Sequence, residues 1–209
     1  MTAEAAPRRG RGRPATTSRE AILDAVEQRL GGEWSVPMIA TDLGISHSAI
    51  YRYFPTKSAL MTAACDRVFA DLQVPPSRDW RAWLMGLSLA WRGMLLRHPF
   101  MVDLAQWSMT ARPTQVNKID PGIEILVAAG FTPLDALEVI SAVTALSQVL
   151  AASEVVASTK DVPPTPFSPL IRSIIASAKP KSGEQALRDA VTLVIDGAEQ
   201  RLGRSRATR

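Results

Sequence analysis

Residues 39–60 read IATDLGISHSAIYRYFPTKSAL, and this stretch decides how the N-terminal part of the chain folds. Ile39 and Leu43 are spaced to lie on one face of a short helix, and Gly44 permits the bend that ends it. Ile45 is placed to plug the corner before a second short helix begins. Two short helices joined by a turn that contains glycine are the pattern of a helix-turn-helix.

Further helices are predicted around this pattern. Thr17 and Glu20, three residues apart, form a capping-box signature, and a helix is expected over 18–30. Ser35 is suited to cap the next helix, since Pro37 in its first turn loses no hydrogen bond. Two more helices are expected after it. Ser46 caps the first, which ends at Pro55, and the second begins near Lys57.

The helix between Ser46 and Pro55 has two different faces. Ile50 and Phe54 are one turn apart and are expected in the core. Such a helix can lie in the major groove of DNA, about 12 Å wide, with its N-terminal residues against base edges. Its other face carries His47, Ser48, Tyr51 and Arg52.

Residues 51–60, taken with the helix before them, resemble the DNA-binding domain of the TetR family of bacterial transcriptional regulators. The resemblance covers about 18–68 and rests on Tyr51, the aromatic pair Tyr53-Phe54 and Lys57. The DNA-binding residues it implies in these helices are Ser35, Ser46, His47, Ser48, Tyr51, Arg52, Tyr53 and Lys57.

The resemblance implies different partners for these residues. His47 and Ser48 fall where family members contact bases, and Ser35 and Lys57 fall where they contact phosphates. The two tyrosines are implied to reach base methyls or phosphates, although aromatic residues at helical spacing also commonly pack a domain. Pro37 departs from the family, because many members have a polar or basic side chain there that reads a base. More of the specificity is therefore expected from the third helix or from the N-terminal segment.

The first 16 residues are basic and lack a helical pattern. Four arginines lie between Arg8 and Arg13, separated by two glycines and followed by Pro14. Alone, this segment is either a solvated tail or an arm that binds nucleic acid. Beside a helix-turn-helix, Arg11 and Arg13 are expected in the adjacent minor groove, whose negative potential attracts arginine. We therefore predict a disordered basic arm over 1–16 and a DNA-binding domain over 17–62.

The remainder of the chain is predicted to be a helical domain over 63–203 with a short tail over 204–209. Asp79 and Thr132 are good helix starts, and Gly130 is a good stop. No strand alternation is found, so the whole chain is expected to be all-α. The predicted helices cover about 80–97, 99–109, 120–129, 133–157, 168–178 and 182–202.

The helices at 133–157 and 182–202 are too apolar on all sides for the surface of a monomer. In the TetR family the corresponding region binds a small molecule and forms the dimer. The resemblance therefore implies that these two helices pair with their symmetry mates in a homodimer. The alternative is that they are the core of a single chain.

Large, adaptable side chains gather in the helices that usually line the ligand pocket of this family. Residues of this kind are either pocket walls or core. Few charges lie in this region, so a mostly apolar effector is expected. The candidate ligand-binding residues are Trp83, Trp91, Met94, Met101 and Trp107.

Composition excludes several other classes of protein. The net charge is +4 and apolar residues make up 46%, as in globular proteins. The single cysteine, Cys65, cannot form an internal disulfide, and with only two histidines in the chain no metal site is expected. Every apolar stretch is judged too interrupted to span a membrane, so a cytoplasmic protein is expected.

Together, the sequence and the resemblance predict a transcriptional regulator that binds specific DNA. It is expected to act as a repressor, released from a palindromic operator by a small effector. No phosphate-binding loop or other cofactor motif is found, and Cys65 with His47 or His98 lacks an acidic partner, so neither a cofactor nor an enzyme is expected. The alternative is an architectural DNA-binding protein dominated by the arginine arm.

Overall fold

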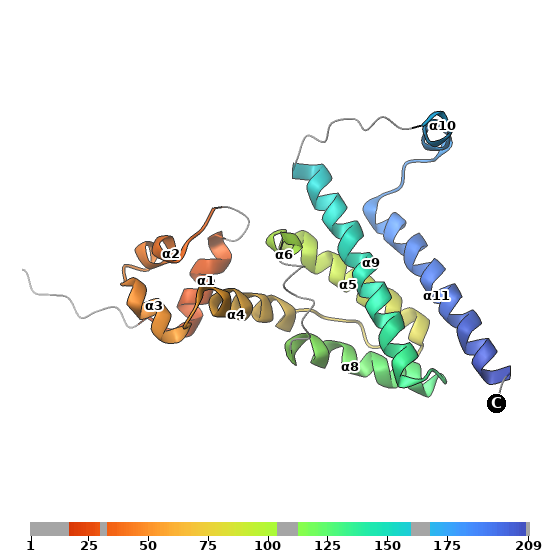
Figure 1. The fold of residues 1–209 in the computed structure, drawn as a ribbon, viewed down its shortest axis with the longest axis horizontal. Coiled ribbons are helices and arrows are strands. Elements are labelled where there is room, and N and C mark those ends of the chain that lie inside the picture. The colour runs from red at the N-terminus through yellow and green to blue at the C-terminus, as the bar shows by residue number, and fades with distance from the viewer. Residues whose placement is uncertain (1–16, 30–32, 104–112, 160–167, 208–209) are drawn as a thin grey trace, which may run out of the picture. The chain divides into compact units, whose positions relative to one another are not determined.

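The computed structural model describes residues 17–29, 33–103, 113–159 and 168–207, and every regular element in those ranges is an α-helix (Figure 1). The predicted all-α fold is thus confirmed. The chain divides into two compact units, Met1–Ala64 and Cys65–Arg209. The helices are α1 (Arg19–Arg29), α2 (Val36–Asp42), α3 (His47–Tyr53), α4 (Lys57–Ala70), α5 (Trp80–Arg97), α6 (Phe100–Asp103), α8 (Pro113–Ala128), α9 (Pro133–Thr159), α10 (Pro169–Ser177) and α11 (Gly183–Ala207).

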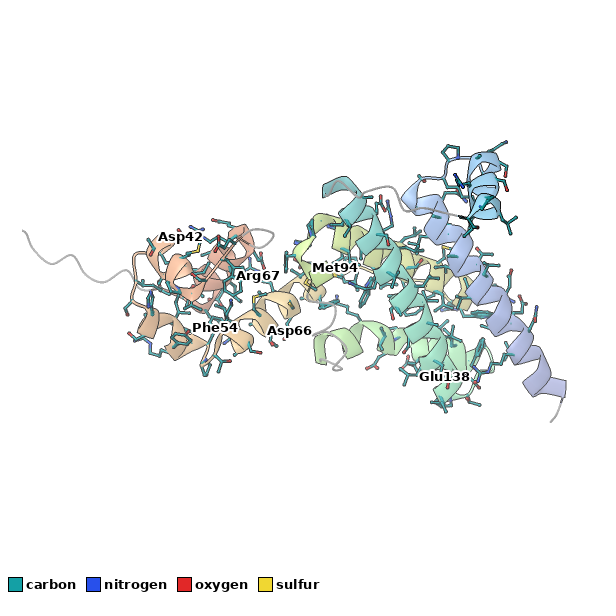
Figure 2. All side chains as sticks on the ribbon, turned by 45° about the horizontal axis from the view of Figure 1, so that its top comes forward. Asp42, Phe54, Asp66, Arg67, Met94 and Glu138 are labelled. Carbon is teal, nitrogen blue, oxygen red and sulfur yellow. The ribbon has the colours of Figure 1, made fainter. Side chains whose placement is uncertain are left out.

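The first unit has an apolar core to which four helices contribute. Ile22 of α1, Ile39 of α2, Ile50 of α3 and Leu60 of α4 are almost completely buried together. Phe54, labelled in Figure 2, joins them directly after α3. The prediction that Ile50 and Phe54 are core residues is confirmed. Each such side chain contributes about 1.5–3 kcal/mol when fully buried.

The turn between α2 and α3 has the geometry that its glycine predicts. Gly44 has a φ of 62°, in the left-handed region that favours glycine. The amide of Ile45 donates to the carbonyl of Ala40 at 3.0 Å, and the Ile45 side chain packs against the core. This hydrogen bond and this packing fix the angle at which α3 follows α2.

Short polar side chains cap the helices of this unit. Ser35 and Ser46 each accept a hydrogen bond from the backbone amide three residues later, as predicted, and Pro37 lies in the first turn of α2. The predicted cap of α1 is wrong by one position. The amide of the third residue after Ser18 donates to its Oγ at 3.0 Å, so Ser18 rather than Thr17 caps the helix, because α1 begins at Arg19.

The second unit is organised around α9, which packs against α5, α8 and α11 (Figure 1). Asp79 caps α5, and the Thr132 hydroxyl accepts from the amide of Asp135 at 3.1 Å where α9 begins. Gly130, with a φ of 107°, ends α8. The helix starts at Asp79 and Thr132 and the helix end at Gly130 are thus confirmed. The core of this unit includes Leu84, Leu87, Met94, Leu126, Ile140, Val143, Leu187 and Val191.

Helix α8 begins earlier than the sequence predicts, and Pro121 lies inside it. An interior proline loses one backbone hydrogen bond and costs about 3 kcal/mol. Two tertiary contacts hold this helix on either side of Pro121. The indole of Trp83 lies directly against Gly122, and the Lys118 ammonium donates to the carbonyl of Ala70 at 2.8 Å.

The residues from Pro133 to Ala157 in α9 form a helix long and apolar enough to cross a membrane, and its most apolar window has a mean hydropathy of 1.7. The prediction that every apolar stretch is too interrupted to span a membrane is therefore wrong for this helix, as judged by its length and composition. Only 28% of the most apolar window is buried within this chain. Leu137 and Val149 are exposed on α9, and Leu193 on α11 is 74% exposed.

Replacing Gly122 with alanine is expected to lower the free energy of unfolding by about 1–3 kcal/mol, because the added methyl group would overlap the indole of Trp83. Urea denaturation of the purified protein measures this difference. Gly197→Ala on α11 is the matched control, since nothing lies within 4 Å of the position that its Cβ would take. The control is expected to be neutral or to gain up to about 1 kcal/mol from helix propensity. Equal stability of the two variants would contradict the packing described.

Candidate nucleic-acid interface

One face of α3 is free of packing in the first unit. His47, Ser48 and Arg52 are exposed, and the Tyr51 side chain is 43% exposed. Ile50, between them in sequence, is fully buried on the opposite face. The predicted division of this helix into an inner and an outer face is therefore confirmed.

The N-terminal ends of α2 and α3 carry serine hydroxyls. Ser35 accepts from the amide of Met38 at 3.4 Å, and Ser46 accepts from that of Ala49 at 3.3 Å. The hydroxyls of Ser46 and Ser48 are 2.9 Å apart. These serines therefore cap their helices, and Ser46 and Ser48 also form a polar, exposed edge at the start of α3.

Lys57 is exposed at the first position of α4. Its ammonium lies 4.5 Å from the centre of the Trp34 ring, a cation–π contact that holds the side chain near the start of the helix. A helix N-terminus presents backbone N–H groups and a positive dipole, which favour an anion. Lys57 adds a full charge of the same sign.

Tyr53 differs from the outward residues of α3. It is half-buried, and its hydroxyl donates to the backbone carbonyl of Thr17 at 2.5 Å. Its ring packs against the core of the first unit. The hydroxyl is thus already used within the protein. Arg11 and Arg13, the remaining predicted DNA-binding residues, lie outside the described residues.

A bidentate ion pair joins α1 to α2 in the first unit. Arg29 donates from Nη2 to Oδ1 of Asp42 at 2.6 Å and from Nε to Oδ2. These hydrogen bonds lower the pKa of Asp42 below its ordinary value of 3.8; desolvation opposes this shift, and the charge of Arg29 adds to it. Sequence reasoning missed the pair, because residues 13 positions apart on different helices share no local pattern.

Four of the five predicted ligand-binding residues are described by the structure, and all four are buried. Trp83, Trp91, Met94 and Met101 are each less than a tenth exposed, and Trp107 lies outside the described residues. The Trp91 ring lies 5.3 Å from that of Phe69 at the end of α4. In the part of the chain that the structure describes, these side chains are packed against protein.

Gln148 of α9 is a polar residue that sequence reasoning missed. Its Oε1 accepts a hydrogen bond from Trp91 Nε1 at 3.0 Å. Its Nε2 is buried and has no hydrogen-bond partner among the described residues. A buried amide donor is usually paired, so this atom is a candidate contact for a hydrogen-bond acceptor. The available signal was a glutamine within an otherwise apolar helix.

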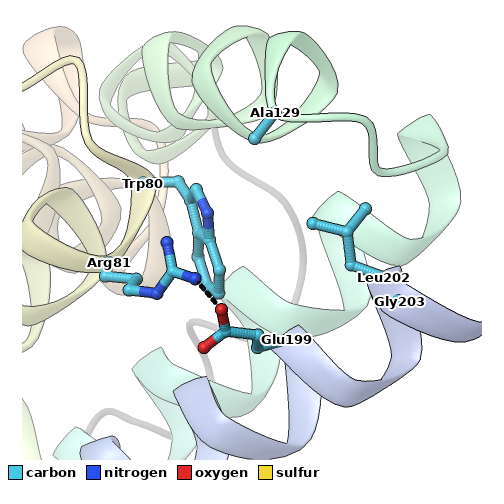
Figure 3. A pocket seen from close by; sticks show the side chains of 6 residues that line it. All are labelled: Trp80, Arg81, Ala129, Glu199, Leu202 and Gly203. Atoms are coloured by element: carbon cyan, nitrogen blue, oxygen red, sulfur yellow. Dashed lines mark hydrogen bonds and ion pairs between the residues drawn. The ribbon is translucent and has the colours of Figure 1, made fainter. Parts of the chain in front are cut away.

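Two cavities lie in the described part of the second unit. One, of about 330 Å³, lies between α5, α8 and the segment before α5, and its walls include Trp83, Lys118 and Pro121. The other, of about 290 Å³, lies beside Trp80 and Glu199 (Figure 3). There the Arg81 guanidinium stacks on the Trp80 indole at 4.4 Å and pairs with Glu199. Of the four predicted ligand residues that the structure describes, only Trp83 lines either of these two cavities.

The first unit therefore has the structure of a helix-turn-helix DNA-binding domain. Helix α2 is capped and is followed by the glycine turn, and the buried face of α3 directs its polar face outward. Comparison with known proteins agrees with this class. Residues 32–64 match the family described as bacterial regulatory proteins, tetR family. Residues 32–64 thus carry a DNA-binding domain of the TetR family, and the chain as a whole is similar to regulators of that family.

Relatives extend the similarity into the second unit. The class A tetracycline repressor from transposon 1721 of Escherichia coli is 28% identical over 175 residues, which cover 78% of this chain and 80% of that repressor. A transcriptional repressor of Mycobacterium tuberculosis is 30% identical over 119 residues, 53% of this chain and 45% of that protein. The chain thus aligns with less than half of the mycobacterial relative.

Solved structures share the fold. ActR of Streptomyces coelicolor in complex with actinorhodin gives a TM-score of 0.77 at 17% identity, covering 90% of this chain and 100% of that one. A TetR variant of Acinetobacter baumannii in complex with minocycline gives a TM-score of 0.68 at 20% identity, covering 90% and 99%. Both similarities concern the arrangement of helices.

Asp42→Asn is expected to lower the melting temperature at pH 7 by removing the ion pair with Arg29. The folded-state pKa of Asp42 lies below the unfolded one, so its stabilisation is complete above about pH 4–5 and is lost as the pH falls through the lowered pKa. The difference between the unaltered chain and the variant should therefore shrink below pH 3.8. Thermal unfolding followed by circular dichroism at several pH values measures it.

Asp196→Asn is the control for this experiment. Asp196 is exposed on α11, and the described residues include no ion pair to it, so the replacement is expected to leave the melting temperature nearly unchanged. A difference at Asp42 that stays constant down to the most acidic pH would argue against the ion pair.

Proposed function

We propose that this protein is a homodimeric repressor that binds a palindromic DNA operator and leaves it when a small, mostly apolar effector binds. The observation that carries the proposal is the exposed polar face of α3, backed by Ile50 and Phe54 in the core. A helix held in this way can enter the major groove without disturbing the fold of its domain.

The DNA-facing residues of the proposal have separate roles. His47, Ser48 and Tyr51 would contact base edges and methyl groups, because they lie on the exposed face of α3. Phosphates would be held at the helix starts and by the cations around them. These phosphate-contacting residues are Ser35, Ser46, Arg52 and Lys57, with Arg11 and Arg13 assigned to the minor groove.

Exposed apolar side chains on α9 and α11 support the proposed dimer. Leu134, Leu137 and Val149 project from α9, and Leu193 projects from α11, while the other faces of both helices are packed in the second unit. A second copy that paired the same two helices would bury these side chains in a four-helix interface with two-fold symmetry. Such a partner also accounts for the apolar composition of α9 without a membrane.

The proposed effector site is centred on Trp91 and Gln148 and includes the buried Met94 and Met101. Because these side chains are packed against protein, the site would have to open when an effector binds. ActR is solved with actinorhodin and a TetR variant with minocycline, so the fold accommodates small molecules. The buried Nε2 of Gln148 favours an effector with a hydrogen-bond acceptor on an otherwise apolar body. Effector binding would act by changing the separation of the two α3 helices, which must match about 34–36 Å of DNA.

We place the protein in the cytoplasm and assign it no enzymatic activity, since its relatives are regulators of transcription. The alternative function, an architectural DNA-binding protein dominated by the arginine arm, would leave the outer face of α3 without a role. The two functions differ in sequence specificity, which can be measured.

Selection from random duplexes is expected to recover a palindromic site that the protein prefers over scrambled DNA by about 10³-fold or more at fixed salt. His47→Ala and Tyr51→Ala should reduce this preference about tenfold each, while leaving binding to scrambled DNA nearly unchanged. Gln28→Ala, at an exposed position of α1, is the matched control. Recovery of no common site would favour the architectural alternative.

Leu193→Lys is expected to convert a dimer into a monomer, because it places a charge in the proposed apolar interface. Light scattering after size-exclusion chromatography measures the mass of each species. Val127→Lys changes an exposed apolar residue on α8 and should leave the dimer intact. A dimer that persists in the Leu193 variant would contradict the proposed interface.

A further inference from the structure

We infer that Tyr53 is a positioning residue, which ties the base of the arginine-rich N-terminal segment to the end of α3. Its hydroxyl donates to the Thr17 carbonyl at 2.5 Å, joining positions 36 residues apart in the chain. Thr17 is the first residue that the structure describes, and four arginines lie between Arg8 and Arg13. The inference rests on the proposed binding of DNA by this unit.

A second set of interactions holds the same two segments together. Arg19, at the start of α1, donates from Nη1 to the backbone carbonyl of Tyr53 at 3.4 Å. The Arg19 guanidinium also lies 4.4 Å from the centre of the Phe54 ring. Because Phe54 is buried in the core, the start of α1 and the end of α3 are held to one rigid part of the unit.

The burial of Tyr53 argues against a direct role for its hydroxyl in DNA binding. That hydroxyl is engaged with a backbone carbonyl, and the ring packs against the core, with the Arg52 guanidinium 5.5 Å from its centre. Tyr51, two positions earlier, is exposed and has no such hydrogen bond among the described residues. The two tyrosines of α3 therefore have different functions: Tyr51 faces outward and Tyr53 holds the chain that leads to the arm.

The hydrogen bond between Tyr53 and Thr17 affects the arm because the arginines lie only a few residues before Thr17. Arg13 lies four positions before Thr17, so their α-carbons are at most about 14 Å apart when the chain is fully extended. Fixing Thr17 beside α3 therefore sets an upper limit on how far an arginine of the arm can be from the DNA that α3 is proposed to bind. Confinement of this kind raises the effective concentration of the arm at the groove without any new interaction with the DNA.

The test compares Tyr53→Phe, deletion of residues 1–14, and both changes together, each in the otherwise complete protein, by titrating the selected operator at several salt concentrations. Deletion of the arm is expected to weaken binding and to reduce the slope of log K against log salt by about 0.9 for each phosphate that the arm neutralises. Tyr53→Phe should weaken operator binding about three- to tenfold in the full chain and have little effect in the deletion background. It should also reduce the salt slope, which a purely structural role would not change.

Tyr51→Phe is the matched control, and any loss of affinity it causes should be the same with and without the arm. Arg19→Gln removes the second tie and should reproduce the arm-dependent loss, so the inference stays testable if Tyr53→Phe folds poorly. Equal losses for Tyr53→Phe in both backgrounds, or no loss in the full chain, would overturn the inference and leave the proposed function standing. Absence of operator binding by the unaltered chain would overturn both.

Discussion

The burial of Ile50 and Phe54 is the constraint on which the rest of the DNA-binding unit depends. These two side chains fix the rotation of α3 about its own axis, so the polar residues between them must face away from the core. The glycine turn at Gly44 fixes the direction from which α3 arrives, and the hydrogen bond from Ile45 to the preceding helix holds that turn. The orientation of the polar face is thus set mainly by apolar packing, and the hydrogen bond at the turn supports it.

In the second unit, α9 has one face in the core and another face that is exposed. One side supplies Ile140 and Val143 to the core, and another leaves Val149 exposed, where the proposed second copy would cover it. Its apolar composition therefore has two separate causes, which the amino-acid pattern alone could not distinguish. The same helix places Gln148 where it orients Trp91. That pairing depends on the register between α5 and α9, which is a tertiary property.

Features set by a few neighbouring residues could be predicted from the sequence. The cap at Ser35 and the bend at Gly44 depend on positions within one helical turn, and the outward face of α3 depends on its periodicity. Interactions between distant segments could not be predicted. The ion pair of Arg29 with Asp42 and the hydrogen bond of Tyr53 to the start of α1 exist only because the core brings different helices together. The sequence could therefore identify which residues are outward, but not that Tyr53 is held inward.

The independence of the outer face of α3 from the core has an evolutionary consequence. His47, Ser48 and Tyr51 contribute little to the packing of the unit, so substitutions at these positions are nearly free of a stability cost. Gene duplication followed by change at only these sites could redirect a copy of the protein to a different DNA sequence while its fold stayed intact. The same geometry makes these three positions a small, self-contained target for engineering regulators that do not cross-react in one cell.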